Sequence, residues 1–356
     1  MKIAIVHDDL MQWGGAERVL LGISELFPEV PIYTLIYDKN NHNLNNFFKD
    51  KKIITSFLQK IPFWRSLYKP LFFLHPLAFE LFDLSDYDLV ISQTTRFAKS
   101  IITRPETIHI CYCHTPPRFL WNFSGEKLPG FLLPFLSWLR IIDRVSTQKV
   151  DLFLAGSENA KRRIKRVYQK ESEVLLPFID LEKYQGVQDF AGGYFLIIAR
   201  LNDYKRVDLA VEAFNKLGLP LKIVGDGPLM GRLKKLAKTN IDFAGGVSEE
   251  LLLNLIAGCR ALIVTAEEDF GLTPLEAQAL GKPVIAFGKG GTLETVIDGK
   301  TGLFFKEQTT ESLIEALEEF NRKTFNPEDC RKNATNFSKQ KFQQKLRELV
   351  KQADSL

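Results

Sequence analysis

The sequence has few of the residues that form covalent crosslinks. Only four of its 356 residues are cysteine, and no two of them form a C-x-x-C pair. A zinc knuckle and a thioredoxin-type redox motif are therefore excluded. Cys111 and Cys113 alternate along an apolar segment, which predicts thiols buried in a strand. Buried free thiols are consistent with a reducing cytosol.

Long apolar runs and a strong net charge are also lacking. No uninterrupted apolar segment is long enough to cross a bilayer as a helix. The apolar run Met1–Val6 is short and is followed at once by His7, Asp8 and Asp9, so it predicts a strand and not a signal peptide. The formal net charge is only +4, which argues against nucleic acid as a partner. We expect a cytoplasmic protein.

The sequence does contain an alternation of strands and helices that is long enough for two domains. A chain of 356 residues with 45% hydrophobic and 25% charged residues suits two α/β domains. In each half, strands and helices alternate as they do in a doubly wound sheet. We expect one Rossmann-like domain over residues 1–180 and a second over 181–336. A helix within 337–356 is expected to pack back on the first domain.

Glycines mark several strand–helix turns, but neither half carries the G-x-G-x-x-G fingerprint, so an NAD-dependent enzyme is disfavoured. Gly14 and Gly15 lie in the first such turn, where they would let a ligand approach the backbone closely. On their own they favour a plain turn. Gly225 and Asp226 follow a strand predicted at 221–224 and resemble a phosphate loop with a different glycine spacing.

The segment 264–277 carries the most functional information. A strand is predicted at 260–264, and the following helix is predicted to have Thr273 as its N-cap and Pro274 as its first residue. The N-terminus of a helix suits a phosphate. Glu268 and Glu276 flank that position, and carboxylates accept hydrogen bonds from sugar and ribose hydroxyls. A solvated loop with an ordinary capping acid fits the same residues.

Two cations, Arg200 and Lys205, follow a strand predicted at 194–199. Ligands in parallel sheets bind at the carboxyl ends of the strands, so this pair is placed to clamp a diphosphate. Such cations can also stabilise the charge of a departing phosphate without a metal. Because basic residues are common on surfaces, an ordinary solvated pair is the alternative.

His114 also follows the carboxyl end of a predicted strand, at 107–113. A histidine there can donate a hydrogen bond to a sugar hydroxyl or carbonyl, and a structural histidine is the less favoured alternative. The triplet 86–88 has the D-x-D form of a metal site in one class of sugar transferases. Because it precedes a strand, we predict a turn there, and no metal site.

Two stretches interleave large aromatic residues with cations, at 57–73 and 127–140. Such a composition suits a membrane interface or a lipid-linked substrate. Irregular helices packed on the sheet, with solvated cations, are the alternative. Prolines prevent either stretch from being a transmembrane helix.

In combination these motifs resemble the retaining glycosyltransferases of family 4, which have the GT-B fold of two Rossmann-like domains facing across a cleft. The resemblance covers essentially the whole chain and is firmest over residues 194–305. It is carried by Ala199-Arg200-Leu201 with Lys205, Val224-Gly225-Asp226-Gly227-Pro228-Leu229, Glu268 to Glu276, and Gly14-Gly15-Ala16-Glu17-Arg18. The stretch Cys111–Trp121 is similar to a subgroup often assigned as mannosyltransferases of surface-polysaccharide assembly. Asn202–Tyr204 depart from the Pro-Glu pair of many members, but the spacing from arginine to lysine is kept.

The resemblance implies a role for each matching residue. The implied catalytic residues are Glu268 at the transferred sugar, His114 near the reacting carbon, and Arg200 and Lys205 at the diphosphate. The implied donor-binding residues are Gly14, Gly15, Gly225, Asp226, Val247 near the base, Phe270, Gly271, Leu272, and Glu276 at the ribose.

The resemblance implies a hexose, with mannose from GDP-mannose preferred, moved from a nucleotide sugar to a glycan or lipid-linked acceptor. We expect no cofactor and no metal. We expect a peripheral contact with the membrane surface. A UDP-sugar-dependent transferase, a nucleotide-sugar epimerase of the same fold and a non-catalytic nucleotide-sugar-binding subunit stay open as alternatives. An epimerase would need no acceptor. A non-catalytic subunit would lack at least one of the implied catalytic residues.

Overall fold

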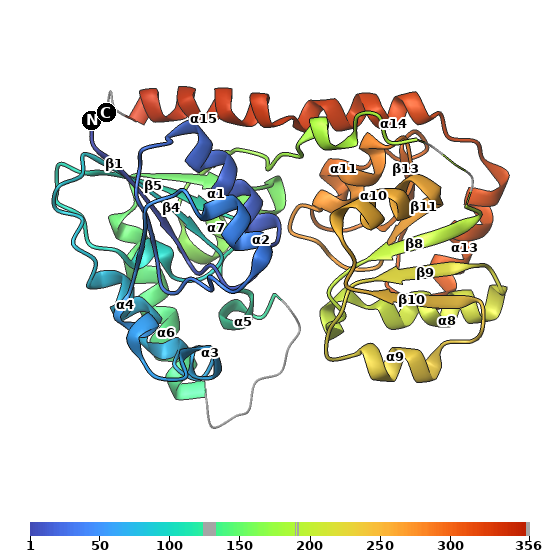
Figure 1. Ribbon diagram of the computed structural model, residues 1–356, viewed down its shortest axis with the longest axis horizontal. Coiled ribbons are helices and arrows are strands. Elements are labelled where there is room, and N and C mark those ends of the chain that lie inside the picture. Colours follow the sequence, from blue (N-terminus) through green and yellow to red (C-terminus); the bar gives the residue numbers. More distant parts are fainter. Residues whose placement is uncertain (124–132, 189, 191, 354–356) are drawn as a thin grey trace. The chain divides into compact units, whose positions relative to one another are not determined.

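The computed structural model describes residues 1–123, 133–188, 190 and 192–353. The chain divides into two compact units, one of Met1–Leu176 with Phe342–Leu356 and the other of Pro177–Lys341. This division comes four residues before the predicted boundary after residue 180. Each unit is described by itself (Figure 1).

The first unit is built on a parallel sheet of seven strands in the order β3-β2-β1-β4-β5-β6-β7. The strands are β1 (Ile3–His7), β2 (Ile32–Thr34), β3 (Ile53–Thr55), β4 (Leu89–Thr94), β5 (Ile108–Cys113), β6 (Leu152–Ala155) and β7 (Glu173–Val174). The central strands are mostly apolar and almost wholly buried, as is typical of parallel strands covered on both faces. Cys111 and Cys113 are buried free thiols in β5, as predicted.

The α-helices of the first unit are α1 (Gly15–Leu26), α2 (His42–Phe48), α3 (Trp64–Leu67), α4 (His75–Glu80), α5 (Arg118–Trp121), α6 (Leu133–Ser146) and α7 (Glu158–Tyr168). Short 3-10 turns are η1 (Phe57–Lys60), η2 (Phe72–Leu74), η3 (Ala98–Ser100) and η5 (Thr147–Lys149). The last helix, α15 (Lys339–Ala353), packs on this unit from Phe342 onward. Gln343 donates to the carbonyl of Gly22 at 3.0 Å, and the Phe342 ring lies 6.1 Å from that of Tyr112.

The second unit has a parallel sheet of six strands in the order β10-β9-β8-β11-β12-β13. The strands are β8 (Tyr194–Ile198), β9 (Leu221–Val224), β10 (Ile241–Gly245), β11 (Cys259–Val264), β12 (Val284–Phe287) and β13 (Gly302–Phe305). The helices and turns are η6 (Leu181–Tyr184), η7 (Asp203–Lys205), α8 (Val207–Leu217), α9 (Met230–Leu236), α10 (Glu249–Gly258), α11 (Leu272–Ala279), α12 (Thr292–Thr295), α13 (Thr310–Arg322), α14 (Pro327–Ala334) and η8 (Thr335–Phe337).

Both faces of the second sheet are apolar and covered. Successive residues of β8 join different core clusters, with Phe195 and Ile197 in one and Tyr194 and Leu196 in the other. Side chains alternate between the faces of a strand, so these clusters lie on opposite sides of the sheet. The predicted α/β class with two doubly wound units is confirmed.

The strand order reverses at one place in each sheet. In the first unit this switch point lies between β1 and β4, and in the second it lies between β8 and β11. Helices that leave from either side of a switch point diverge, so a crevice opens outside the carboxyl ends of those two strands. Each of these crevices is therefore a candidate ligand site.

Close packing at the carboxyl end of β8 requires one particular glycine. Gly225, the residue after β9, has φ +123°, and a Cβ there would overlap the carbonyl oxygen of Ala199. Gly231 in α9 has open space around it and an ordinary helical backbone. The two glycines therefore form a matched pair for substitution.

We expect Gly225→Ala to lower the free energy of unfolding by about 2 kcal/mol or more, because it adds both backbone strain and a steric overlap. Gly231→Ala should be neutral or stabilise by up to about 1 kcal/mol, because alanine is the better helix former. Calorimetric melting of the two variants beside the wild type measures the difference. A Gly225→Ala protein that melts at or above Gly231→Ala would contradict the packing described.

Candidate functional site

Lys205 and Glu268 meet at the switch point of the second unit. Lys205 ends the turn η7 after β8, and Glu268 lies in the loop after β11. The Lys205 Nζ is 2.6 Å from Glu268 Oε1, and both side chains are more than four-fifths buried, at 16% and 18% exposure. Thr265, which follows β11, donates its hydroxyl to the carbonyl of Lys205 at 2.6 Å. The acid and the cation that the sequence singled out separately are therefore one ion pair.

The helix after Glu268 begins earlier than predicted. Gly271 is the N-cap of α11, and Leu272 is its first residue. The prediction of Thr273 as N-cap and Pro274 as first residue is wrong, since the chain turns at Gly271 with φ +97°, a conformation that glycine adopts without strain. Pro274 is the third residue of the helix, where its missing N–H costs no intrahelical hydrogen bond. Glu276, predicted in the first turn, is therefore the fifth residue of the helix and lies beyond that turn, with 3% exposure.

The loop between Glu268 and the helix is held from two sides. Gly291 donates its N–H to the carbonyl of Glu268 at 2.8 Å, and Gly290 forms a bridge with the same residue. The buried ring of Phe270 lies 5.8 Å from that of Phe337, edge to face. The carboxylate of Glu268 is therefore presented from a fixed backbone.

The loops after β8 and β9 are joined to each other by their backbones. Asp226 accepts a hydrogen bond from the N–H of Leu201 at 2.9 Å through its carbonyl. Its side chain accepts from the N–H of Gly227 at 2.7 Å, which closes a tight turn. Arg200, the neighbour of Leu201, is exposed at the same place. The predicted loop at Gly225 and Asp226 is therefore packed against the loop that carries the cations.

All predicted donor residues of the second unit follow the carboxyl ends of its strands. These are Arg200 and Lys205 after β8, Gly225 and Asp226 after β9, Val247 after β10, and Glu268, Phe270, Gly271, Leu272 and Glu276 after β11. In a parallel sheet these ends share one edge. At that edge the start of α11 adds backbone N–H groups and a partial positive charge. The arrangement suits an anion flanked by hydroxyl-bearing groups.

In the first unit, His114 follows β5 and is held by a residue that sequence reasoning missed. The fully buried Gln93 of β4 donates from Nε2 to the carbonyl of Ala16 at 2.7 Å, and the same Nε2 lies 2.7 Å from His114 Nε2. An amide nitrogen only donates, so Nε2 of His114 accepts and the proton of the neutral ring sits on Nδ1. Gln93 pairs in register with His7 at the carboxyl end of β1, a pairing that the sequence alone does not show.

Gly14 and Gly15 lie at the switch point of the first unit. Gly14 is the N-cap of α1 with an extended backbone, and Gly15 is the first residue of the helix. Behind them, Glu17 is buried and its Oε1 lies 3.8 Å from Nε2 of His7. The structure therefore places both glycines at a strand–helix turn, as predicted.

A second feature that sequence reasoning missed lies beside them. Asp8, directly after β1, accepts hydrogen bonds from the backbone N–H groups of Phe97 and Ala98, both at 2.9 Å. Burial alone would raise the pKa of Asp8, but the Arg96 charge, His7 and these backbone donors hold it at about 2. Its neighbour Asp9 pairs with Arg96 and is itself buried. The sequence signal for this feature was the pair Asp8 and Asp9 directly after a predicted strand.

The D-x-D triplet at 86–88 lies at the amino end of β4, as predicted. The backbone N–H of Lys2 donates to the side chain of Asp88 at 2.6 Å, which ties the turn to the start of the sheet. Within the described ranges, no group of three or more histidine, cysteine, aspartate or glutamate residues is arranged to hold a metal ion.

The aromatic–basic stretch at 57–73 forms η1, α3 and η2. Leu58 and Tyr68 are buried, so part of the stretch packs on the sheet. Phe63 is 84% exposed, and Trp138 of the second stretch is 47% exposed. Residues 127–132 of that second stretch lie outside the described residues. In the part of the chain that the structure covers, no helix combines the length and apolarity that a membrane span requires.

Comparison with known proteins agrees with this geometry. Residues 189–337 match the family model for glycosyl transferases group 1. The α-1,3/1,6-mannosyltransferase ALG2 of Debaryomyces hansenii is 24% identical over 83% of this chain and 76% of its own length. The protein of that name from Saccharomyces cerevisiae is 26% identical over 83% and 71%, and the one from Mus musculus is 24% identical over 90% and 87%.

Two solved structures share the fold of this chain. Anabaena Alr3699/HepE, solved with UDP and glucose, has a TM-score of 0.73 at 17% identity and covers 99% of both chains. Sucrose-phosphate synthase from Thermosynechococcus elongatus has a TM-score of 0.75 at 16% identity over 100% of both. The predicted GT-B fold is confirmed by this likeness. Residues 189–337 thus match the model of a group 1 glycosyltransferase domain, and this match, together with the mannosyltransferase relatives, supports glycosyltransferase activity.

Proposed function

We propose that this glycosyltransferase moves mannose from GDP-mannose to a glycan or lipid-linked acceptor, with retention of configuration and without a metal. The observation that carries the proposal is the ion pair of Lys205 and Glu268 at the switch point, beside the start of α11. The choice of mannose is supported by the mannosyltransferase names of the relatives from Debaryomyces hansenii, Saccharomyces cerevisiae and mouse.

The second unit supplies groups for each part of the donor. Arg200 and Lys205 would bind the diphosphate, with Lys205 oriented by its contact with Glu268. The N–H groups at the start of α11 would add to this anion site. Glu268 would accept hydrogen bonds from the transferred sugar, and Glu276 from the ribose.

The proposed reaction uses no metal and no dedicated base. The acceptor hydroxyl would attack the anomeric carbon from the face that the diphosphate leaves, as the bond from that carbon to the phosphate oxygen breaks. The departing phosphate oxygen would take the proton of the acceptor hydroxyl, so no separate base is required. Negative charge grows on the phosphate in the transition state, where fixed cations lower the barrier.

From the first unit, His114 would donate a hydrogen bond from Nδ1 to the sugar near the reacting carbon. Gln93 would set this tautomer, since it occupies Nε2. Gly14 and Gly15 would leave room for the diphosphate beside the start of α1. Exposed Phe63 and Trp138 support a peripheral contact with the cytoplasmic membrane face, where a lipid-linked acceptor would lie.

A UDP-sugar is the second candidate donor. One observation favours it, namely that the Anabaena protein with the same fold was solved with UDP and glucose. The diphosphate site would serve either nucleotide, because it contacts groups that the two share. The choice therefore depends on the base and the sugar.

Replacing Lys205 or Arg200 by alanine should lower the turnover of sugar transfer about a hundredfold or more, because charge that develops on the leaving phosphate loses a fixed donor. Lys216→Ala is the matched control, since Lys216 lies on α8 in an exposed pair with Glu311 at 2.9 Å. Initial rates with radiolabelled donor, measured in the presence of EDTA, provide the test. Unchanged transfer by both Lys205→Ala and Arg200→Ala would contradict the assignment, and loss of wild-type activity in EDTA would contradict metal independence.

A thermal-shift panel distinguishes the donors. GDP-mannose should raise the melting temperature of the wild type, because a ligand that binds only the folded state stabilises it by mass action. UDP- and ADP-sugars at the same concentration should raise it less. The Lys205→Ala protein should show a reduced shift with GDP-mannose. A larger shift with a UDP-sugar would overturn the mannose assignment.

A further inference from the structure

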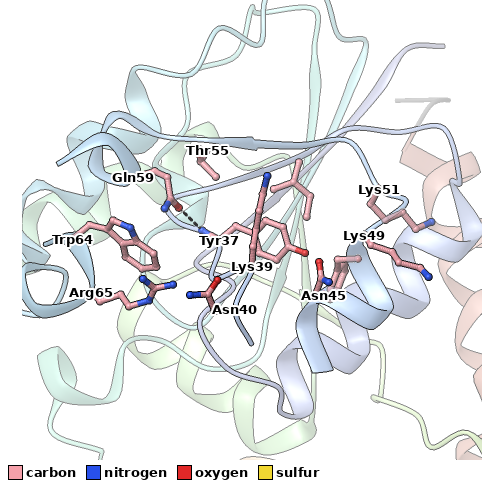
Figure 2. Close-up of a pocket in the computed structure, with 12 residues that line it drawn as sticks. Tyr37, Lys39, Asn40, Asn45, Lys49, Lys51, Thr55, Gln59, Trp64 and Arg65 are labelled. Atoms are coloured by element: carbon pink, nitrogen blue, oxygen red, sulfur yellow. Dashed lines mark hydrogen bonds between the residues drawn. The ribbon is translucent and has the colours of Figure 1, made fainter. Parts of the chain in front are cut away.

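The first unit contains a polar cavity that neither His114 nor Gly14 lines. It has a volume of about 510 Å³ and lies along the edge strand β3, between α2 and α3. Figure 2 shows Trp64 and Arg65 at one end and Lys49 and Lys51 at the other, with Tyr37 between them. It is lined by Tyr37, Lys39, Asn40, Asn45, Phe48, Lys49, Lys51, Ile53, Thr55, Gln59, Trp64 and Arg65.

The lining is strongly basic. Four of its residues are cations and none is an acid. Arg65 is partly neutralised by Asp38, whose Oδ1 lies 2.5 Å away, and Lys51 donates to the carbonyl of Ser24 at 2.9 Å. The side chains of Lys39 and Lys49 make no hydrogen bond or ion pair with any residue that the structure describes. A cavity walled by unpaired cations attracts an anion.

Tyr37 adds an unsatisfied donor to this cavity. Its side chain is 6% exposed, and its hydroxyl has no hydrogen-bond partner among the described residues. Its backbone is fixed, since the N–H donates to Gln59 Oε1 at 2.7 Å (Figure 2). Burial raises the pKa of Tyr37, so the hydroxyl keeps its proton and can donate. A buried polar group without a partner costs stability, which is recovered when a ligand accepts its hydrogen bond.

An apolar group stands directly beside the cavity. Phe63 precedes Trp64 and Arg65, is 84% exposed, and has φ +56°. The left-handed conformation is disfavoured for a bulky residue, and full exposure of the ring is also unfavourable. Despite both costs, the ring of Phe63 is held in solvent next in sequence to two residues that line the basic cavity. Such a pairing suits a ligand with an anionic head and an apolar tail.

We propose that this cavity binds the phosphate of a lipid-linked acceptor. The phosphate would be held by Lys39, Lys49 and the Tyr37 hydroxyl, the neutral amides of the lining would contact the attached sugar, and the lipid would leave past Phe63. This inference rests on the proposed function for the identity of the occupant as acceptor. The recognition of a phosphate rests on the cavity alone.

Binding to vesicles tests this without requiring turnover. The full chain is co-sedimented with phosphatidylcholine vesicles with or without a polyisoprenyl phosphate, and inorganic pyrophosphate serves as competitor. Lys49→Ala should weaken binding about tenfold, the usual value of one charge-assisted hydrogen bond. Lys52→Ala is the matched control, because Lys52 is an exposed lysine three residues away that does not line the cavity. It should bind as the wild type does.

Two further variants separate a ligand contact from a loss of folding. Tyr37→Phe should weaken binding about threefold to tenfold, while its melting temperature without ligand stays equal to or above that of the wild type. Phe63→Ser should weaken vesicle binding and leave pyrophosphate binding unchanged. If Lys49→Ala and Tyr37→Phe bind like Lys52→Ala, or if binding does not depend on the phosphate lipid, the proposal is wrong. If Phe63→Ser binds the vesicles as the wild type does, the lipid part of the proposal is wrong and the cavity is a site for a free phosphate.

The design also separates this inference from the proposed function. Lys205→Ala should bind the phosphate vesicles normally while losing transfer. In the transfer assay, Lys49→Ala should raise the KM for the acceptor and leave the KM for the donor unchanged. If the wild type binds the vesicles but transfers no sugar, the proposed function fails and phosphate recognition stands. If transfer proceeds and the acceptor KM of Lys49→Ala is unchanged, the cavity is not the acceptor site.

Discussion

Parallel strands buried on both faces leave only their ends for polar chemistry, and this constraint organises both units. In the second sheet, Phe195 and Tyr194 pack into cores on opposite faces, so both faces of the central strands are covered. The functional groups lie in the loops after the strands. At the switch point the loops after β8 and β11 diverge, and there the Lys205–Glu268 pair is buried to more than four-fifths.

The same constraint explains how much could be predicted from the sequence. The apolar runs gave the strands, and polar residues directly after them pointed to Arg200, Lys205 and Glu268. Their pairing could not be predicted, because it depends on which strands are neighbours. The start of α11 was misplaced because threonine and proline are common at helix starts, as at Thr273 and Pro274. The chain turns instead at Gly271, and its positive φ cannot be predicted from the sequence pattern.

Other functional candidates depend on contacts between distant segments. Gln93 lies inside a buried strand, and only the folded sheet brings it to His114. The basic cavity collects residues from 37 to 65, most of which look like ordinary surface residues in sequence. Tyr37 is distinguished by an unsatisfied hydroxyl, which only the structure can show. On this account one unit carries groups for a diphosphate donor, and the other carries groups for a phosphate at the acceptor.

The central claim is that the groups around Lys205 and Glu268 promote transfer of a sugar with retention and without a metal. The most direct measurement is the anomeric configuration of the product that the wild type forms from GDP-mannose and a lipid-linked acceptor in EDTA, read from the one-bond carbon–proton coupling at the new linkage. The account predicts an α-linked mannose, the configuration of the donor. A β-linked product, or conversion of the donor sugar without any acceptor, would contradict it.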